Sequence, residues 1–325
     1  MSPRGAVFRN GMKAAAKTIL AAERILIVCH RRPDGDAIGS LLALGLGLLS
    51  LDKQVVMVSP DGVPPRYQFL PGSELILKKL AGKVDAAVAV DCGSAEQLGA
   101  AARLFKAAPV SVQIDHHDFA DRFGMHLVAD AAAAAVGEIV YELLLTMKAQ
   151  ITPVIATCLL TAIIVDTGSF RFSNVRSRTF RICADLLDCG ADLKYLVDEA
   201  YWKKTESTMR LEALCVNQMR FERNGKVVWS YIRQRDFARL NGQVADVDGV
   251  ADDLRSLEGV KIAALFREDP CGRCRVSLRS ATGINVAEVA RHFGGGGHFN
   301  SAAFWISNTK SERSRVIRVI SSVVP

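Results

Sequence analysis

Residues 24–40 read "RILIVCHRRPDGDAIGS", and the character of the sequence changes twice within this stretch. An apolar run rich in isoleucine stops at His30, a turn containing proline and glycine follows, and a long apolar helical pattern begins after the turn. This order of strand, loop and helix is typical of the first unit of a parallel α/β sheet. Asp34 and Asp36 fall in the loop, so one imidazole and two carboxylates are crowded at the end of the strand.

The same alternation of strand and helix continues through the first half of the chain. Short β-rich runs recur as "QVVMVS", "DAAVAV" and "VSVQI", and helical patterns cover residues 131–147 and the stretch that begins with Pro153 behind Thr152. Such alternation predicts an α/β fold, with a parallel sheet that has helices on both faces.

The pattern changes after residue 177, where the chain is expected to be helical as far as about Gln218. A hairpin signal follows in "RFERNGKVVWSYI", with Asn224 and Gly225 at the turn, and two further strands and a helix come after it. We therefore expect a parallel-sheet metal-binding catalytic domain in residues 1–186, a helical connector in residues 187–218, and a smaller α/β substrate-binding domain in residues 219–325.

Composition favours a globular protein with an anionic partner. The 325 residues are 50% hydrophobic, and 41 Lys and Arg against 34 Asp and Glu give a net charge of +7. This excess favours nucleotide, RNA or phosphate-ester ligands, although a solvated basic surface explains it equally well. No apolar stretch reaches the ~18 residues of a membrane-spanning helix, and the eight cysteines in apolar surroundings suit buried thiols. We expect a cytoplasmic protein without a membrane partner.

Acidic and imidazole side chains follow four apolar runs at the points where these runs end. We interpret all four runs as strands of the parallel sheet, whose carboxyl ends lie at one edge, so these side chains should converge. The candidates are His30, Asp34, Asp36, Asp91, Asp115, His116, His117 and Asp166. Each element alone has a simpler explanation: a common turn, a helix cap, or a surface pair of histidines. Their joint placement at successive ends favours a shared site.

Such a group of carboxylates needs protons or cations to exist. Unit charges about 4 Å apart repel each other by about 4 kcal/mol at an effective dielectric constant near 20. Oxygen and nitrogen donors suit Mn²⁺, Mg²⁺, Fe²⁺ or Zn²⁺, and two ions about 3.5–4 Å apart, bridged by a carboxylate, would use the whole set. A pair of this kind promotes in-line displacement at phosphorus, so the pattern predicts a metal-centred phosphoesterase.

A glycine run near the C-terminus provides a second candidate site. Residues 294–297 are all glycine and precede His298. A backbone without side chains can approach an anion closely and direct its amides at it, and the imidazole adds a hydrogen bond or a charge. A flexible loop is the alternative interpretation.

In order along the chain, "HRRPDGDAIGS", "VDCGS", "IDHH", "VDTGSFRFSN" and a distal "GGGGH" resemble the signature motifs of the DHH/DHHA1 phosphoesterase family. The resemblance covers nearly the whole chain, and the compact form is similar to the bifunctional oligoribonuclease and 3′-phosphoadenosine 5′-phosphate (pAp) phosphatase type. One departure is Ala303, where the family often has a further glycine, and it bears on the local loop geometry only.

The resemblance also implies a role for each matching residue. It implies that His30, Asp34 and Asp91 hold one Mn²⁺, and that Asp36, Asp91, His116 and Asp166 hold a second, with Asp91 bridging. His117 would face the phosphate and Asp115 would orient a histidine. The implied substrate-binding residues are Gly295, Gly296, Gly297 and His298, with Arg171 and Asn174 as further candidates.

Three functions remain open from the sequence. The leading hypothesis is a Mn²⁺-dependent hydrolase of short oligoribonucleotides and of pAp, whose partners are its nucleotide substrates. A second keeps the chemistry but takes cyclic dinucleotides or their linear products. A third is a nucleotide-sensing module that binds without cutting. The sequence does not decide the metal used in the cell, the direction of exonuclease attack, or whether the chain forms a homodimer.

Overall fold

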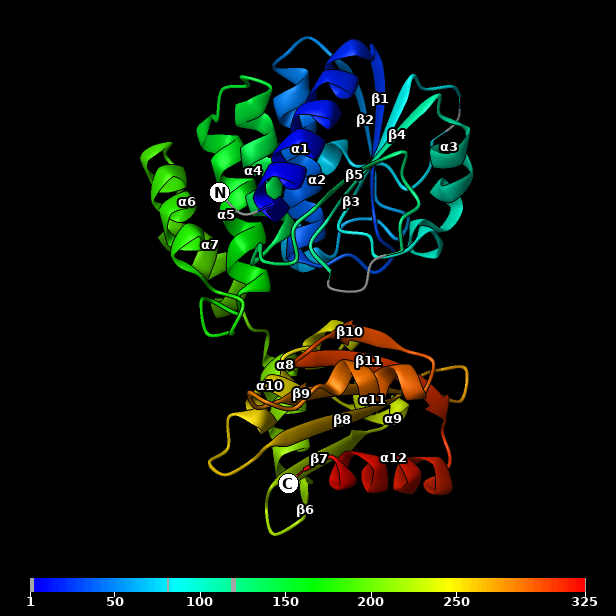
Figure 1. Cartoon of the computed structure of the whole chain (residues 1–325). Helices are drawn as coiled ribbons and strands as arrows, with labels where there is room; N and C mark the ends of the chain where they lie inside the picture. The colour runs from blue at the N-terminus through cyan, green and yellow to red at the C-terminus, as the bar shows by residue number, and fades with distance from the viewer. Residues whose placement is uncertain (1–2, 81, 118–120, 325) are drawn as a thin grey trace. The chain divides into compact units, whose positions relative to one another are not determined.

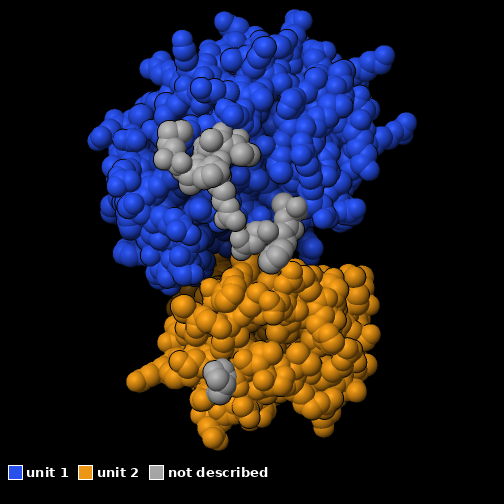
Figure 2. All heavy atoms as spheres, viewed as in Figure 1, with its two compact units in different colours: residues 1–203 blue, residues 204–325 orange. Residues whose placement is uncertain are grey.

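The computed structural model describes residues 3–80, 82–117 and 121–324. The chain divides into two compact units, residues 1–203 and residues 204–325, which we call unit 1 and unit 2 (Figure 2). Each unit has two hydrophobic cores, and the largest of the four lies in unit 1.

Unit 1 is built on a five-stranded sheet in which neighbouring strands pair in parallel, in the order β2-β1-β3-β4-β5. The strands are β1 (Arg24–Cys29), β2 (Gln54–Val58), β3 (Ala86–Val90), β4 (Val110–Asp115) and β5 (His126–Ala129). All five residues of β3 are buried, as expected for a strand covered on both faces. The predicted parallel sheet is confirmed.

Helices cover both faces of this sheet, also as predicted (Figure 1). One face carries α1 (Pro3–Ala21), α2 (Gly35–Leu49), α4 (Val136–Thr146) and α5 (Pro153–Asp166), and the other carries η3 (Ala95–Ala101) and α3 (Ala102–Ala107). Successive residues of β1 lie in different cores. Ile25 and Ile27 belong to the core on the face that carries α1, α2, α4 and α5, and Leu26 and Val28 belong to the core on the other face. Two short 3-10 turns, η1 (Pro65–Tyr67) and η2 (Ser73–Leu75), follow β2.

The helices on the first face approach each other closely because glycines stand at their contacts. A Cβ atom placed at Gly39 of α2 would lie 2.5 Å from the main-chain oxygen of Cys158 on α5. A Cβ atom at Gly137 of α4 would lie 2.7 Å from the Cβ atom of Ala162 on α5. Both distances are too short for a real contact. The contacts of α5 with α2 and α4 therefore require glycine, which has no side chain, at positions 39 and 137.

Three predictions about unit 1 need correction. Asp166 does not end a strand but ends α5, which begins with Thr152 as N-cap and Pro153 in its first turn. The run before Asp166 is apolar and buried almost throughout, so its periodicity does not separate a helix from a strand, although its length favours the helix. Residues 131–135 precede α4 instead of forming its first turns, and the edge strand β5, only four residues long, was missed.

Unit 1 ends with helices and unit 2 begins with one. The elements are α6 (Ser177–Asp188), α7 (Leu193–Val197), a π-helical turn η4 (Asp198–Trp202) and, in unit 2, α8 (Glu206–Asn217). Gly190, with φ of 95°, follows α6 in the left-handed conformation typical of a helix end. None of the helices in the described ranges combines the length and apolar character that a membrane crossing requires.

Unit 2 contains a six-stranded sheet in the order β10-β11-β9-β8-β7-β6, antiparallel except between β7 and β8. Its strands are β6 (Arg220–Glu222), β7 (Val227–Ile232), β8 (Ile262–Glu268), β9 (Arg273–Ser280), β10 (Gly296–His298) and β11 (Ser301–Ser307). One face packs against α11 (Val286–His292) and α12 (Lys310–Ser322). The other packs against α8, α9 (Gln234–Arg239), η5 (Val244–Val247) and α10 (Val250–Arg255). The predicted turn at Asn224 and Gly225 joins β6 to β7.

Candidate metal centre

The loops after β1, β3 and β4 and the end of α5 bring the predicted acids and histidines of unit 1 together. They form two groups of donor atoms that share Asp91. The Asp34 set consists of His30, Asp34 and Asp91, and the Asp36 set consists of Asp36, Asp91, His116 and Asp166. The sequence analysis predicted that these residues converge, and the geometry agrees.

The Asp34 set is arranged around the imidazole of His30. His30 Nε2 lies 3.4 Å from Asp91 Oδ2 and 4.0 Å from Asp34 Oδ1. The other ring nitrogen, Nδ1, is 2.8 Å from the main-chain oxygen of Arg31, which fixes the ring with Nε2 directed at the carboxylates. Asp34 is also the N-cap of α2, since its Oδ1 accepts a hydrogen bond of 3.0 Å from the amide of Ala37.

The Asp36 set surrounds the imidazole of His116 in the same way. His116 Nε2 lies 3.5 Å from Asp166 Oδ2, 3.9 Å from Asp36 Oδ2 and 3.9 Å from Asp91 Oδ1. Its Nδ1 is 3.2 Å from the main-chain oxygen of Ala133. Both histidines therefore place Nε2 among carboxylates while Nδ1 is held by a main-chain carbonyl, which is the usual arrangement of metal-binding histidines.

Asp91, the residue shared by the two sets, has an unusual backbone conformation and, among the described residues, an unsatisfied side-chain oxygen. Its φ of 56° is left-handed, a conformation that costs a residue other than glycine roughly 1–2 kcal/mol. Its side chain is 4% exposed, and within the described parts of the chain Oδ1 has no hydrogen-bond partner although it is buried. A strained residue with an unsatisfied carboxylate oxygen between two donor sets fits a ligand that bridges two cations.

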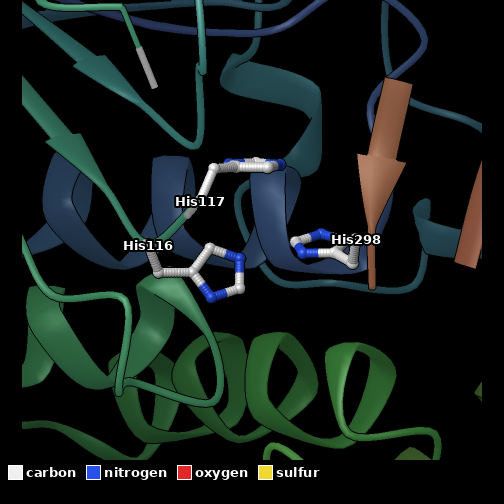
Figure 3. A group of neighbouring side chains, drawn as sticks. All are labelled: His116, His117 and His298. Carbon is white, nitrogen blue, oxygen red and sulfur yellow. The ribbon is translucent and has the colours of Figure 1, made fainter. Parts of the chain in front are cut away.

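His117 and Asp115 form a third element beside the two sets. His117 Nδ1 donates to Asp115 Oδ1 at 2.6 Å, and the same oxygen accepts the main-chain amide of His116 at 2.9 Å. Asp115 is fully buried, whereas the His117 side chain is 24% exposed. Figure 3 shows that the two rings are separate, and they meet edge to face with centroids 5.2 Å apart. Asp115 thus orients the His117 ring through Nδ1.

The pKa values of these groups reflect the crowding of charge. Burial, with Asp91 and Asp166 nearby, raises the pKa of Asp36 well above its ordinary value, and burial raises the pKa of Asp166 to about 7. Burial alone would lower the pKa of His116, but Asp166, Asp36 and Asp91 raise it to about 10. Protons shared among these side chains therefore offset the repulsion, and divalent cations can replace them.

Main-chain and amide groups around the Asp36 set hold its carboxylates in place. Asp36 accepts three hydrogen bonds: 2.7 Å from the amide of Val136, 3.0 Å from the amide of Gly137, and 2.9 Å from Ser40 Oγ. The side-chain amide of Asn174 donates to the main-chain oxygens of Asp166 and Ala134 at 3.0 and 2.9 Å. Sequence reasoning missed this support, because the carbonyls of an alanine run and the amides directly after it carry no side-chain signal.

Arg171 and Asn174, the two candidate substrate contacts in the loop after α5, engage their own surroundings. Arg171 is exposed, and its Nε donates to the main-chain oxygen of Gly168 at 2.6 Å. Asn174 uses its amide nitrogen as described above, and its Oδ1 is buried without a hydrogen-bond partner in the described ranges. Asn174 therefore positions the end of α5, and Arg171 remains a candidate for substrate contact.

The glycine run lies in unit 2, between α11 and β11. Gly295 and Gly297 are needed for packing: a Cβ atom would lie 2.3 Å from the main-chain oxygen of Ala303 at the first and 2.4 Å from that of Ser301 at the second. Gly296 has open space where its side chain would be. His298, the end of β10, is the fourth candidate and is labelled in Figure 3. At least two of the glycines thus have a structural reason for their identity, besides any role with a ligand.

Cysteines near the centre are not nucleophiles. Burial raises the pKa of Cys29 to about 12 and that of Cys92 well above its ordinary value. Neither thiol would be ionised at neutral pH. Both act as small apolar side chains behind the site, as the sequence analysis expected, and all eight cysteines are free.

Comparison with known proteins places this chain in one family. Residues 24–163 match the DHH family, N-terminal domain, and residues 224–324 match the DHHA1 domain. The chain belongs to the DHH/DHHA1 family of phosphoesterases, and it is a hydrolase of phosphoester bonds.

Within the family, the chain is similar to enzymes of a particular type. It is 32% identical over 296 residues to the bifunctional oligoribonuclease and PAP phosphatase NrnA of Thermus thermophilus, which covers 90% of this chain and 87% of that protein. It is 24% identical to the cyclic-di-AMP phosphodiesterase PdeA of Listeria monocytogenes, over 90% of this chain and 46% of PdeA. A crystal structure of an exopolyphosphatase-related protein from Bacteroides fragilis superposes with a TM-score of 0.90 at 25% identity, covering 97% of this chain and 96% of that one.

Proposed function

We propose that this protein hydrolyses short oligoribonucleotides to mononucleotides and removes the 3′-phosphate of pAp. The reaction would use two divalent metal ions, of which Mn²⁺ is the leading candidate. The observation that carries the proposal is Asp91, a strained and incompletely satisfied carboxylate between two sets of donors. One ion alone would leave one of the two sets unused. A single carboxylate shared by two sets is the arrangement that a two-metal phosphoesterase requires.

The Asp34 set would hold one ion and the Asp36 set the other, with Asp91 as the common ligand. Both sets consist of carboxylate oxygens and imidazole nitrogens, which suit Mn²⁺ and exclude the softer ions that prefer thiolates. When bound, such ions supply Lewis acidity and positive charge at the phosphoryl group. The chain's own contribution is to fix the ligand atoms before the substrate arrives.

His117 is the residue that we assign to proton transfer or to charge stabilisation at the phosphate. Burial alone would lower its pKa, but the hydrogen bond to Asp115 raises it above the ordinary value. The hydrogen bond from Nδ1 to Asp115 favours the protonated imidazole, which is the form that can give a proton to a departing oxygen. Asp115 acts as the positioning residue of this pair.

Substrate binding is assigned to the second part of the chain. We place the catalytic domain in residues 1–186, the helical connector in residues 187–218 and the substrate-binding domain in residues 219–325. In that domain the run Gly295–Gly297 and His298 would receive the substrate phosphate, with Arg171 of the catalytic domain as a further contact. Of the three glycines, Gly296 has the open space that a ligand needs.

Two observations bear on the substrate. Similarity to NrnA over nearly the whole chain favours short oligoribonucleotides and pAp. Similarity to PdeA, whose name states cyclic-di-AMP phosphodiesterase activity, supports cyclic dinucleotides or their linear products as the alternative. A module that only senses nucleotides would not need the complete set of donors that surrounds Asp91.

A substrate panel tests the proposal. Purified protein with Mn²⁺ is incubated with pAp, with ribonucleotide dimers to pentamers, and with cyclic di-AMP, each at the same concentration. We expect phosphate from pAp and mononucleotides from the oligomers, and no product after chelation. Absence of product from both pAp and the oligomers, or turnover that survives the chelator, would refute the proposal. Faster turnover of cyclic di-AMP would favour the alternative.

A further inference from the structure

The segment between β5 and α4, residues 130–137, supports the Asp36 set from outside. Its main chain contacts two of the four members directly: the oxygen of Ala133 faces His116 Nδ1, and the amides of Val136 and Gly137 donate to Asp36. The third contact is indirect, because Asn174 joins the oxygen of Ala134 to the main-chain oxygen of Asp166. The position of this segment therefore sets the positions of the Asp36 set.

Regular secondary structure does not hold residues 130–135 of the segment, because β5 ends at Ala129 and α4 begins at Val136. Asp130 shapes its start: Oδ1 accepts the amide of Ala132 at 3.0 Å, and the main-chain oxygen accepts the amide of Ala133 at 2.9 Å. The rest of the restraint comes from another helix.

That restraint is the guanidinium of Arg178, near the start of α6. Its NH1 donates to Asp130 Oδ2 at 2.6 Å, and its Nε lies 3.4 Å from Glu138 Oε2. A third carboxylate, Glu142, lies 3.1 Å from NH2. Glu138 is 1% exposed and Arg178 only 30% exposed, so these ion pairs are poorly screened by solvent. Arg178 thus hydrogen-bonds Asp130 at the start of the segment and forms an ion pair with Glu138, the residue directly after its end.

The Asp34 set has separate supports. His30 is held by the main-chain oxygen of Arg31, and Asp34 by the amide of Ala37 in its own helix. The next loop contributes Asp61, whose carboxylate accepts the amide of Arg32 at 2.8 Å. None of these groups belongs to residues 130–137 or to α6. A change at Arg178 should therefore reach one set and leave the other unaltered.

We propose that Arg178 is a positioning residue that tunes the affinity of one of the two metal ions, the one held by the Asp36 set, through residues 130–137. The inference rests on the proposed function, since it assumes that the Asp36 set binds an ion. Groups that orient metal ligands from outside contribute about 10–100-fold to metal affinity when they are removed. Replacing a residue that only stabilised the fold would not weaken the binding of one ion and spare the other.

The test is a titration of the metal-free full-length protein with Mn²⁺, in which free Mn²⁺ is measured by electron paramagnetic resonance. We expect two binding steps in the unaltered protein. In Arg178→Met, one step weakens 10–100-fold and the other changes less than about twofold. Arg178→Lys keeps the charge but loses the forked guanidinium. Its Mn²⁺ affinity at the weakened step should lie between that of the unaltered protein and that of Arg178→Met. Arg181→Met, at an exposed position of the same helix, is the matched control and should leave both steps unchanged.

A second variant keeps the proposal testable if Arg178→Met does not fold. Asp130→Asn keeps an oxygen that can accept the amide of Ala132, but it places an NH2 group where Asp130 Oδ2 accepts from Arg178, so it should weaken the same step. The double variant Arg178→Lys with Asp130→Asn should show less than the sum of the two effects, because both changes break one contact. Two unaltered steps in these variants, or equal weakening of both steps, would overturn the inference. If the unaltered protein binds no Mn²⁺, the proposed function itself fails.

Discussion

Replacement of Asp91 by asparagine should abolish tight binding at both metal sites at once. Asparagine keeps the shape of the side chain, and it tolerates the left-handed backbone at this position at least as well as aspartate does. The fold should therefore survive while one negative charge disappears. Asp34→Asn is the matched control, because Asp34 belongs to one set only and asparagine is an equally good N-cap for α2.

The expected magnitude follows from the distances around Asp91. Its Oδ2 lies 3.4 Å from His30 Nε2 and its Oδ1 lies 3.9 Å from His116 Nε2, so one carboxylate serves both sets. A single unit-charge pair at about 4 Å is worth roughly 4 kcal/mol at an effective dielectric constant near 20, before desolvation is subtracted. We expect each ion to lose at least about 100-fold in affinity, which corresponds to about 2.8 kcal/mol.

Calorimetric titration with Mn²⁺ measures this directly, with circular dichroism to confirm that each variant is folded. Asp91→Asn should show no tight step, and Asp34→Asn should keep one of the two. Turnover of pAp at saturating substrate should fall with the loss of metal in both variants. An Asp91→Asn protein that still binds one ion with unaltered affinity would show that Asp91 does not bridge, and the two-metal interpretation of the site would be wrong.

Three further results are expected. His117→Gln should lower kcat about 10²–10⁴-fold while Mn²⁺ affinity stays nearly constant, and a matching loss of metal would instead make His117 a ligand. Gly297→Ala should lower the thermal unfolding temperature of unit 2, because the new Cβ atom would lie 2.4 Å from the main-chain oxygen of Ser301 at a φ of 141°. Gly296→Ala, with open space around it, should not, and equal effects would contradict the packing argument. In the folded protein, the exposed Cys271 should react with a thiol reagent far faster than the buried cysteines. Burial raises the pKa of two of these, Cys158 and Cys274, to about 12. A Cys271→Ser variant that still reacts as fast as the unaltered protein would contradict this.

The sequence alone predicted the fold and the convergence of the site because both depend on side-chain pattern. Apolar runs that end in His30, Asp91 and Asp115 are strands of one parallel sheet, and the carboxyl ends of such strands must lie at one edge. The error at Asp166 did not move the residue out of the site, because a helix that packs on this sheet can end at the same edge.

What the sequence could not show is the support provided by main-chain atoms. The alanine run before Val136 contains no polar side chain, yet its carbonyls and the amides that follow hold His116 and Asp36. The left-handed backbone of Asp91 is equally invisible, because aspartate is common in ordinary turns and helix caps. Arg178, between three carboxylates, could be recognised only once α4 and α6 were placed side by side.

The glycine contact between α2 and α5 has a consequence for how ions are selected. Asp36 lies in the first turn of α2 and Asp166 at the last turn of α5, and Gly39 lets these two helices touch through main-chain atoms. If Asp36 and Asp166 hold one ion, as proposed, helices in main-chain contact would resist the separation of the two carboxylates that a wider ion needs. A substitution at Gly39 would then change which ions fit, even with both carboxylates unchanged.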